Sequence, residues 1–276
     1  MRTAASFRHH GPGSENHLDQ SLWAKQSSFL IFQTMLGKVG LNRRGKTWFQ
    51  IFKAPLSKIL SLLGRATDEL LTTTRAVRRR LDLNRQVGRE VIEECIEVAA
   101  QAPNAGNRQK IHFVVVTEKK KRASLAEIYR KGSAEYFRMR RADLAKGSGN
   151  TVKDAAEKRV VDSAWYLHEH LHEVPVHVIP CINGRTDGMP ASAQAARWGS
   201  IFPAAWSFML AGRARGLGMT FTTLHLNCER EAAELLDIPF DEVMQAGLLP
   251  VAFTRGTDFK PAARTSVPEM THWNSW

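Results

Sequence analysis

The stretch APNAGNRQKIHFVVV, residues 102–116, holds a helix end, a polar turn and a strand in succession. Pro103 ends the preceding helix because proline has no N–H to continue the hydrogen-bond ladder. IHFVVVT (111–117) is a continuous apolar run rich in β-branched residues, which is typical of a strand buried on both faces. The amide side chains in the turn both donate and accept hydrogen bonds, which suits them to recognise the edge of a heterocycle.

Helices and strands alternate on the C-terminal side of this stretch, and helices precede it. We expect helices over residues 68–74, 88–102, 119–131, 153–173, 200–215 and 229–238, and strands over 111–117, 174–182, 219–224 and 247–253. Residues 132–152, rich in Gly, Ser and Arg, are expected to be a mobile excursion, and residues 254–276 show no clear period. The alternation predicts one layered α/β or α+β domain over residues 67–276.

The N-terminal segment has a different composition. Residues 1–66 contain ten of the 39 Lys and Arg residues and two of the 27 acidic ones, in a chain of net charge +12. Because most of the basic excess lies there, we predict no nucleic-acid partner for the domain. Residues 1–20 are expected to be disordered. Residues 21–64 are expected to contain amphipathic helices that pack on the protein or a partner subunit; a weak membrane-surface contact and a gene-start error remain alternatives.

Cysteine usage and hydropathy bear on the compartment. The three cysteines, Cys95, Cys181 and Cys228, are far apart and form no C-x-x-C pair. This spacing argues against a disulfide framework or a structural zinc site and fits a reducing compartment, so we expect the cytoplasm. There is no charge-free apolar run of about eighteen residues, so no transmembrane helix is expected.

Residues 168–173, HEHLHE, match the His-Glu-x-x-His pattern of zinc hydrolases through His168, Glu169 and His172. Such a site needs a third ligand downstream. The nearby candidate, His177, falls within the next predicted strand. We therefore expect no metal here, and interpret the stretch as a helix end whose cationic side chains complement the helix dipole.

Two basic segments lie at opposite ends of the domain. TTTRAVRRR (72–80) places Arg75 and Arg78 three residues apart, and DFKPAAR (258–264) contains Lys260 and Arg264. Runs of charge are usually solvated surface, so each segment alone is weak evidence. Together they indicate a phosphate held by guanidinium groups, whose planar fork matches phosphate oxygens.

The order of five motifs resembles the nitroreductase family of FMN-dependent oxidoreductases over about residues 67–276. The motifs are RAVR (75–78), APNAGNRQ (102–109), GLG (216–218) before a threonine-rich strand, LLPVA (248–252), and the segment from Lys260 to Arg264. The threonine-rich strand, which leads into Leu226-Asn-Cys228, also resembles the iodotyrosine deiodinase branch of that family.

The resemblance implies a fold and a set of cofactor contacts. The fold would be α+β in three layers: a central mixed, largely antiparallel sheet of four to five strands flanked by helices, in a domain-swapped homodimer with FMN at the interface. Arg75 and Arg264 would bind the FMN phosphate, and Arg78 would stabilise the anionic reduced flavin. The implied FMN-binding residues are Arg75, Ala76, Val77, Arg78, Asn104, Asn107, Gln109, Thr222, Thr223 and Arg264.

The resemblance also implies an activity. NAD(P)H would give hydride to the flavin and leave, and a nitroaromatic, a quinone or a related small electrophile would take the electrons in the same pocket, a ping-pong scheme in which the flavin carries the chemistry. The chain departs from the family at Ala76, where the family has serine, and at Lys110-Ile111, where it has Pro-Trp. The second departure alters the substrate side, so a flavin-binding or flavin-sequestering protein with little turnover is the alternative.

Overall fold

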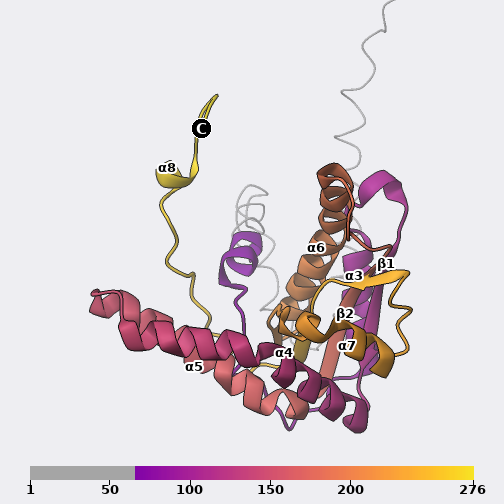
Figure 1. Ribbon diagram of the computed structural model, residues 1–276, viewed down its shortest axis with the longest axis horizontal. Coiled ribbons are helices and arrows are strands. Elements are labelled where there is room, and N and C mark those ends of the chain that lie inside the picture. Colours follow the sequence, from indigo (N-terminus) through magenta and orange to yellow (C-terminus); the bar gives the residue numbers. More distant parts are fainter. Residues whose placement is uncertain (1–65) are drawn as a thin grey trace, which may run out of the picture. The chain divides into compact units, whose positions relative to one another are not determined.

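The computed structural model describes residues 66–276, so the expectations for residues 1–65 lie outside the described part of the chain. A helix over residues 66–73 opens this part. The longer elements that follow are shown in Figure 1. The helices are α3 (Arg89–Ala100), α4 (Lys119–Lys146), α5 (Thr151–His170), α6 (Ala191–Ala214), α7 (Glu229–Leu235) and α8 (Val267–Met270), and the 3-10 helices are η2 (Ala105–Asn107), η3 (Leu171–Glu173) and η4 (Leu224–Cys228). No helix in residues 66–276 is long and apolar enough to cross a membrane.

The sheet has five strands, and every strand pair in it is antiparallel. The strands are β1 (Ile111–Val116), β2 (Val176–Asn183), β3 (Leu217–Met219), β4 (Val243–Gln245) and β5 (Leu249–Phe253). Their order is β1-β2-β5-β3, and β4 pairs with β2 beyond the end of β5. A parallel bridge between Ala76 and Met219 makes the arrangement mixed. The predicted mixed, largely antiparallel sheet is thereby confirmed.

The central strand β2 separates two halves of the core. Its side chains alternate between the two faces of the sheet, as in any strand. Ile179 and Cys181 belong to a cluster with residues of α4, α5 and α7, whereas Val176 and Val178 belong to a cluster with residues of α3 and α6. Because both faces are covered by helices, β2 is apolar at nearly every position. These layers (Figure 1) confirm the expected three-layer α+β fold.

The expectation of a mobile excursion over residues 132–152 was wrong for most of its length. Helix α4 continues unbroken to Lys146, and α5 starts at Thr151 after a short connection. Arg140 of α4 pairs with Glu157 of α5 at 2.7 Å. Gly132 looked like a helix breaker in the sequence, but it lies where α4 crosses η4, and a Cβ there would overlap the carbonyl oxygen of Leu224.

Several element boundaries also differ from expectation. The expected strand 219–224 overlaps β3 only at Met219, and Thr222 instead forms an isolated bridge with Leu248. Strand β4 was not expected because it is short and lies among polar residues. Helix α6 begins at Ala191, nine residues earlier than expected, since Gly199 and Pro203 are tolerated inside it.

Candidate functional site

The RAVR motif, Arg75 to Arg78, runs beside β3 directly after the first described helix. The N–H of Val77 donates a hydrogen bond to the carbonyl oxygen of Met219 at 2.9 Å, and Ala76 forms the parallel bridge to the same residue. Val77 is buried, and its Cβ lies 3.0 Å from where a Cβ on Gly218 would be. The glycine therefore allows the motif to approach the strand closely. Ala76 is exposed, and the two arginines are half-buried.

The C-terminal segment is fixed next to this motif. Arg75 donates from Nη1 to the carbonyl oxygen of Lys260 at 2.8 Å. Arg80 pairs with Asp258 at 2.6 Å, and its guanidinium also lies 4.3 Å from the ring centre of Phe259. Arg213 of α6 lies 4.5 Å from the same ring, so Phe259 contacts two cations. The segment entering the tail is thus held at the edge of the sheet.

Arg264 is the one predicted phosphate ligand that the structure does not bring to this corner. Its side chain is exposed, and its hydrogen bond within the described residues goes to the carbonyl oxygen of the neighbouring Ala263. The segment from residue 261 to residue 266 has no regular secondary structure. Lys260, by contrast, reaches Arg75 through its main chain.

Arg78, Tyr129 and Thr222 form a partly desolvated group. The Tyr129 hydroxyl lies 3.3 Å from Oγ1 of Thr222. Burial lowers the pKa of the Arg78 guanidinium, an effect that the neighbouring Tyr129 opposes. Burial raises the pKa of the Tyr129 phenol, against the hydrogen bond from Thr222 and the charge of Arg78. An arginine remains cationic in such surroundings, so the group presents one positive charge and two hydroxyls.

Sequence reasoning missed Tyr129. It lies on the inner face of α4 among Leu125 and Ala126, where an aromatic side chain indicates core packing. Thr223, which was predicted to lie near the cofactor, is exposed at the start of η4.

The predicted amide residues occupy a separate turn before β1. The side chain of Asn104 accepts a hydrogen bond from the N–H of Gln109 at 2.9 Å, which closes the turn. Asn107 and Gln109 both have left-handed backbone angles, φ 49° and φ 51°, an uncommon conformation outside glycine. The N–H of Ala105 donates to Oγ of Ser200 at 2.9 Å, which anchors the turn on α6.

The RAVR motif and the turn at residues 104–109 do not contact each other. Within residues 66–276 no hydrogen bond or ion pair joins the RAVR motif to the turn at 104–109. Two aromatic side chains of α6 stack on each other, Trp198 and Phe202, with ring centres 5.1 Å apart. Phe202 also meets Phe221, which follows β3, edge-on at 5.8 Å. Phe202 and Trp206 are 43% and 42% exposed, which leaves an apolar surface on α6.

A pocket opens between the turn and the first turns of α6, and we call it the turn–α6 pocket. Its volume is about 370 Å³. It is lined by Asn104, Ala105, Gly106, Arg108, Lys110, Ile182, Asn183, Met189, Ala193, Ala196, Arg197 and Ser200. It has the size expected for a small-molecule site.

The HEHLHE stretch forms the end of α5 and the following η3, which lead into β2. His168 lies 2.9 Å from Oγ of Ser133 through Nδ1, and its ring stacks on Trp165 with centres 4.4 Å apart. Burial lowers the pKa of His168. His170 pairs with Glu173 at 2.6 Å. In the described part of the chain no three His, Cys, Asp or Glu side chains are grouped so that they could hold a metal ion.

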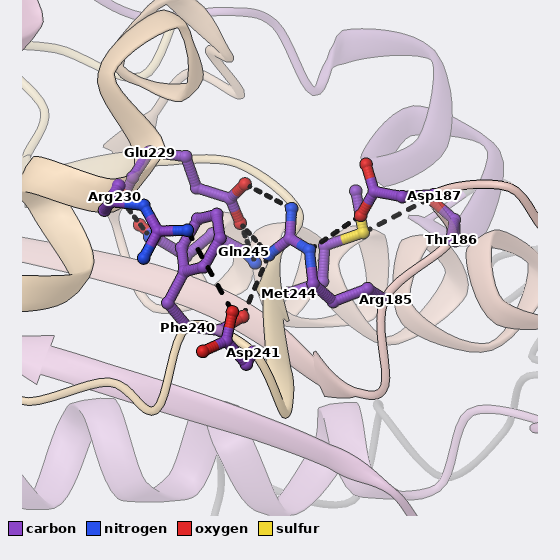
Figure 2. Close-up of polar contacts among 9 residues, drawn as sticks. All are labelled: Arg185, Thr186, Asp187, Glu229, Arg230, Phe240, Asp241, Met244 and Gln245. Carbon is purple, nitrogen blue, oxygen red and sulfur yellow. Dashed lines mark hydrogen bonds and ion pairs between the residues drawn. The ribbon is translucent and has the colours of Figure 1, made fainter.

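A further polar cluster fixes the loop after β2, and Figure 2 shows it. Arg185 pairs with Glu229 at 2.9 Å and with Asp187 at 2.6 Å. Glu229 also accepts a hydrogen bond from the N–H of Gln245 at 3.1 Å. Phe240 lies between two guanidiniums, those of Arg185 and Arg230, each 4.0 Å from its ring centre. The cluster ties the loop, α7 and β4 together.

A family model described as the nitroreductase family matches residues 71–253. The chain belongs to the nitroreductase family. The match spans four of the five motifs, from RAVR to LLPVA, and ends before Lys260. No curated protein matches the chain.

Solved structures of other proteins share the fold of this family member at low sequence identity. Oxidised iodotyrosine deiodinase bound to FMN and 3-iodo-L-tyrosine is 19% identical, with a TM-score of 0.55 over 75% of this chain and 98% of that one. A BluB-like flavoprotein from Clostridium difficile 630 is 18% identical, with a TM-score of 0.55 over 75% and 98%. The FMN-dependent nitroreductase NfnB from Mycobacterium smegmatis, in complex with NADPH, is 20% identical, with a TM-score of 0.54 over 77% and 99%.

Proposed function

We propose that the protein is an FMN-dependent NAD(P)H oxidoreductase that reduces a nitroaromatic, a quinone or a related small electrophile. The observation that carries the proposal is the position of the RAVR motif. Hydrogen bonding of Val77 to Met219 holds Arg75 and Arg78 at the end of the sheet where Thr222 also lies. Family membership and the FMN named in two of the similar structures support the cofactor.

The chemistry of the donor set fits FMN. Arg75 retains guanidinium donors beyond the one used on Lys260, and they are suited to a phosphate. Arg78 is desolvated beside Tyr129, where its charge acts at low dielectric on a developing anion. Thr222 offers a hydroxyl that can donate to a ring oxygen or nitrogen. When bound, the flavin supplies two-electron hydride acceptance and donation. The protein binds, orients and electrostatically tunes it.

A homodimer would complete this site. The turn with Asn104, Asn107 and Gln109 does not reach the RAVR motif within one chain, so we propose that the turn of one copy meets the RAVR motif of the other across α6. The exposed side chains of Phe202 and Trp206 support an apolar interface there. The tail beyond Phe253 would reach the partner, since Trp273 and Trp276 are 84% and 101% exposed and β1 is an edge strand.

The cytoplasm is the proposed compartment. Cys95, Cys181 and Cys228 are all free, and Cys95 and Cys181 are buried, as expected of thiols that serve as small apolar side chains.

The test is the absorbance spectrum of the full-length purified protein. We expect an oxidised-flavin spectrum that NADH or NADPH bleaches under anaerobic conditions and that a nitroaromatic or quinone restores. A colourless protein that takes up no added FMN would overturn the proposal. Bound flavin that neither nucleotide reduces would favour the sequestering alternative.

A further inference from the structure

We propose that the turn–α6 pocket binds an anionic group, a carboxylate or a phosphate, of the small molecule that exchanges electrons with the flavin. Naming that molecule rests on the proposed function; binding of the anion does not. The supporting observation is that positively charged side chains line a cavity of small-molecule size. One of them, Lys110, stands where the family has proline.

Three cations from three segments line the pocket. Arg108 lies in the turn, Lys110 lies just before β1, and Arg197 projects from α6. The described residues that line the pocket include no acidic side chain, and none of these cations forms an ion pair with another residue in the range 66–276. Unpaired cations around one concavity raise the local concentration of anions.

The rest of the lining is apolar or neutral. Ile182, Met189, Ala193 and Ala196 form apolar walls, and the hydroxyl of the buried Ser200 is already used to accept from Ala105 and to donate to the carbonyl of Ala196. The lining therefore favours a flat or apolar body with one anionic group. Such an amphipathic ligand matches a substituted aromatic acid or the phosphorylated end of a nucleotide.

Arg197 is held in place before any ligand arrives. Its Nη1 donates to the carbonyl oxygen of Asn183 at 2.7 Å. The guanidinium lies over the bare Cα of Gly184, where a Cβ would overlap it. The φ of +83° at this position independently favours glycine. Asn183 is in turn fixed by its own N–H, which donates to the carbonyl oxygen of Lys110 at 3.0 Å. An arginine ordered in this way loses little conformational entropy on binding an anion.

The cluster of Figure 2 holds the loop that follows β2. Arg185, one position after Gly184, is anchored by Glu229 and Asp187. The carbonyl oxygen of the next residue, Thr186, accepts from the N–H of Met189 at 3.1 Å, which fixes the loop between β2 and α6 further. This loop contributes Asn183 and Met189 to the lining.

The anion has two possible sources, the 2′-phosphate of NADPH and the carboxylate of an electron acceptor. Binding of 4-nitrobenzoate and of its neutral isostere 4-nitrobenzamide to the full-length protein, measured by calorimetry at low salt, tests the carboxylate. The ratio of kcat/KM for NADPH to that for NADH tests the phosphate. The calorimetric binding and the kcat/KM ratio are each measured for the wild type, Arg197→Gln, Lys110→Ala and a control, Arg138→Gln. The control is suitable because Arg138 pairs with Glu135 on an exposed helix face.

We expect the wild type to prefer one anion about tenfold over its neutral or unphosphorylated counterpart, and both pocket variants to lose most of that preference, while the control keeps it. Lys110 is exposed, so its variant folds even if Arg197→Gln does not. The proposal is overturned if neither pair is discriminated, if discrimination survives both variants, or if the variants lose only FMN. A colourless wild type that still prefers 4-nitrobenzoate would refute the oxidoreductase and keep the anion pocket.

Discussion

The guanidinium of Arg75 donates a hydrogen bond to the main-chain oxygen of Lys260, 185 positions later in the chain. One end of the described domain is thereby connected to the other. A guanidinium has five N–H donors, and this contact uses one of them. The side chain of Arg75, which we propose binds the phosphate, is therefore already oriented by the protein.

Replacing Arg75 tests that role. In Arg75→Ala, the dissociation constant for FMN should rise about 10- to 100-fold, because a charge-assisted hydrogen bond to phosphate is lost. Titration of apoprotein with FMN, followed by quenching of flavin fluorescence, measures it. Arg89→Ala is the control, since Arg89 pairs with Glu93 on an exposed helix face. Equal affinity in both variants would remove Arg75 from the site.

Arg78 should act on the redox potential more than on binding. Its charge lies in a desolvated position beside Tyr129, so Arg78→Gln should destabilise the anionic reduced flavin relative to the oxidised form. We expect the two-electron midpoint potential to fall by roughly 30 to 60 mV, since 30 mV corresponds to about 1.4 kcal/mol. Anaerobic reductive titration against a reference dye measures it. A potential equal to that of the wild type would show that Arg78 does not face the flavin.

The sequence was sufficient for the parts of this site that depend on local chemistry. The strand at β1 and the end of α3 followed from the apolar run at 111–117 and from Pro103, because both are determined by short-range constraints. The expected burial of this strand on both faces was wrong, since β1 is an edge strand and Val116 is its one buried residue. The RAVR motif was found through its charges and its place in the motif order. Its contact with Met219 could not be foreseen, since it depends on the position of β3.

Long-range packing decided the features that sequence reasoning missed. Tyr129 resembles any core aromatic until α4 crosses η4 and brings its hydroxyl to Thr222. Strand β4 exists because β2 extends past the end of β5 and offers it a pairing edge at Cys181. Arg197 lies in the first turns of α6, which were expected to be loop. The turn–α6 pocket therefore could not be predicted from the sequence.

The ion pair between Arg185 and Glu229 should be important for stability. Their side chains are 19% and 13% exposed, so removing one partner leaves a poorly solvated charge. Glu229→Ala should lower the free energy of unfolding by about 3 kcal/mol. Glu231→Ala, two positions later, breaks the exposed pair with Lys131 and should cost less than about 1 kcal/mol. Urea denaturation of the two variants compares them directly; similar losses would refute the difference.

Two buried histidines should make the fold sensitive to acid. Burial lowers the pKa of His177 and of His225 to about 4, so both are neutral in the folded protein. The unfolded chain takes up these protons near pH 6.5, and stability should therefore fall as the pH drops from about 6.5 to about 4. Each histidine contributes at most roughly 3 kcal/mol over that window.

Urea denaturation at pH 7.5 and pH 5.0 measures this dependence. His225→Leu should show a shallower loss between the two values than the wild type, because one proton-binding group of the unfolded chain is gone. His112→Leu is the matched control, since His112 is exposed on β1. An unchanged pH dependence in His225→Leu would contradict the assignment.

Gly132 has a consequence for how this family member can vary. Inside a helix, glycine ordinarily costs about 1 kcal/mol relative to alanine, so a protein engineer seeking thermostability would replace it first. Here the Cβ of an alanine would push the α4 backbone away from the carbonyl oxygen of Leu224. Thr222 lies two residues before Leu224, so the shift would also separate Tyr129 from Thr222. A glycine outside the proposed flavin site thus limits which stabilised versions of this protein can keep the contact between Tyr129 and Thr222.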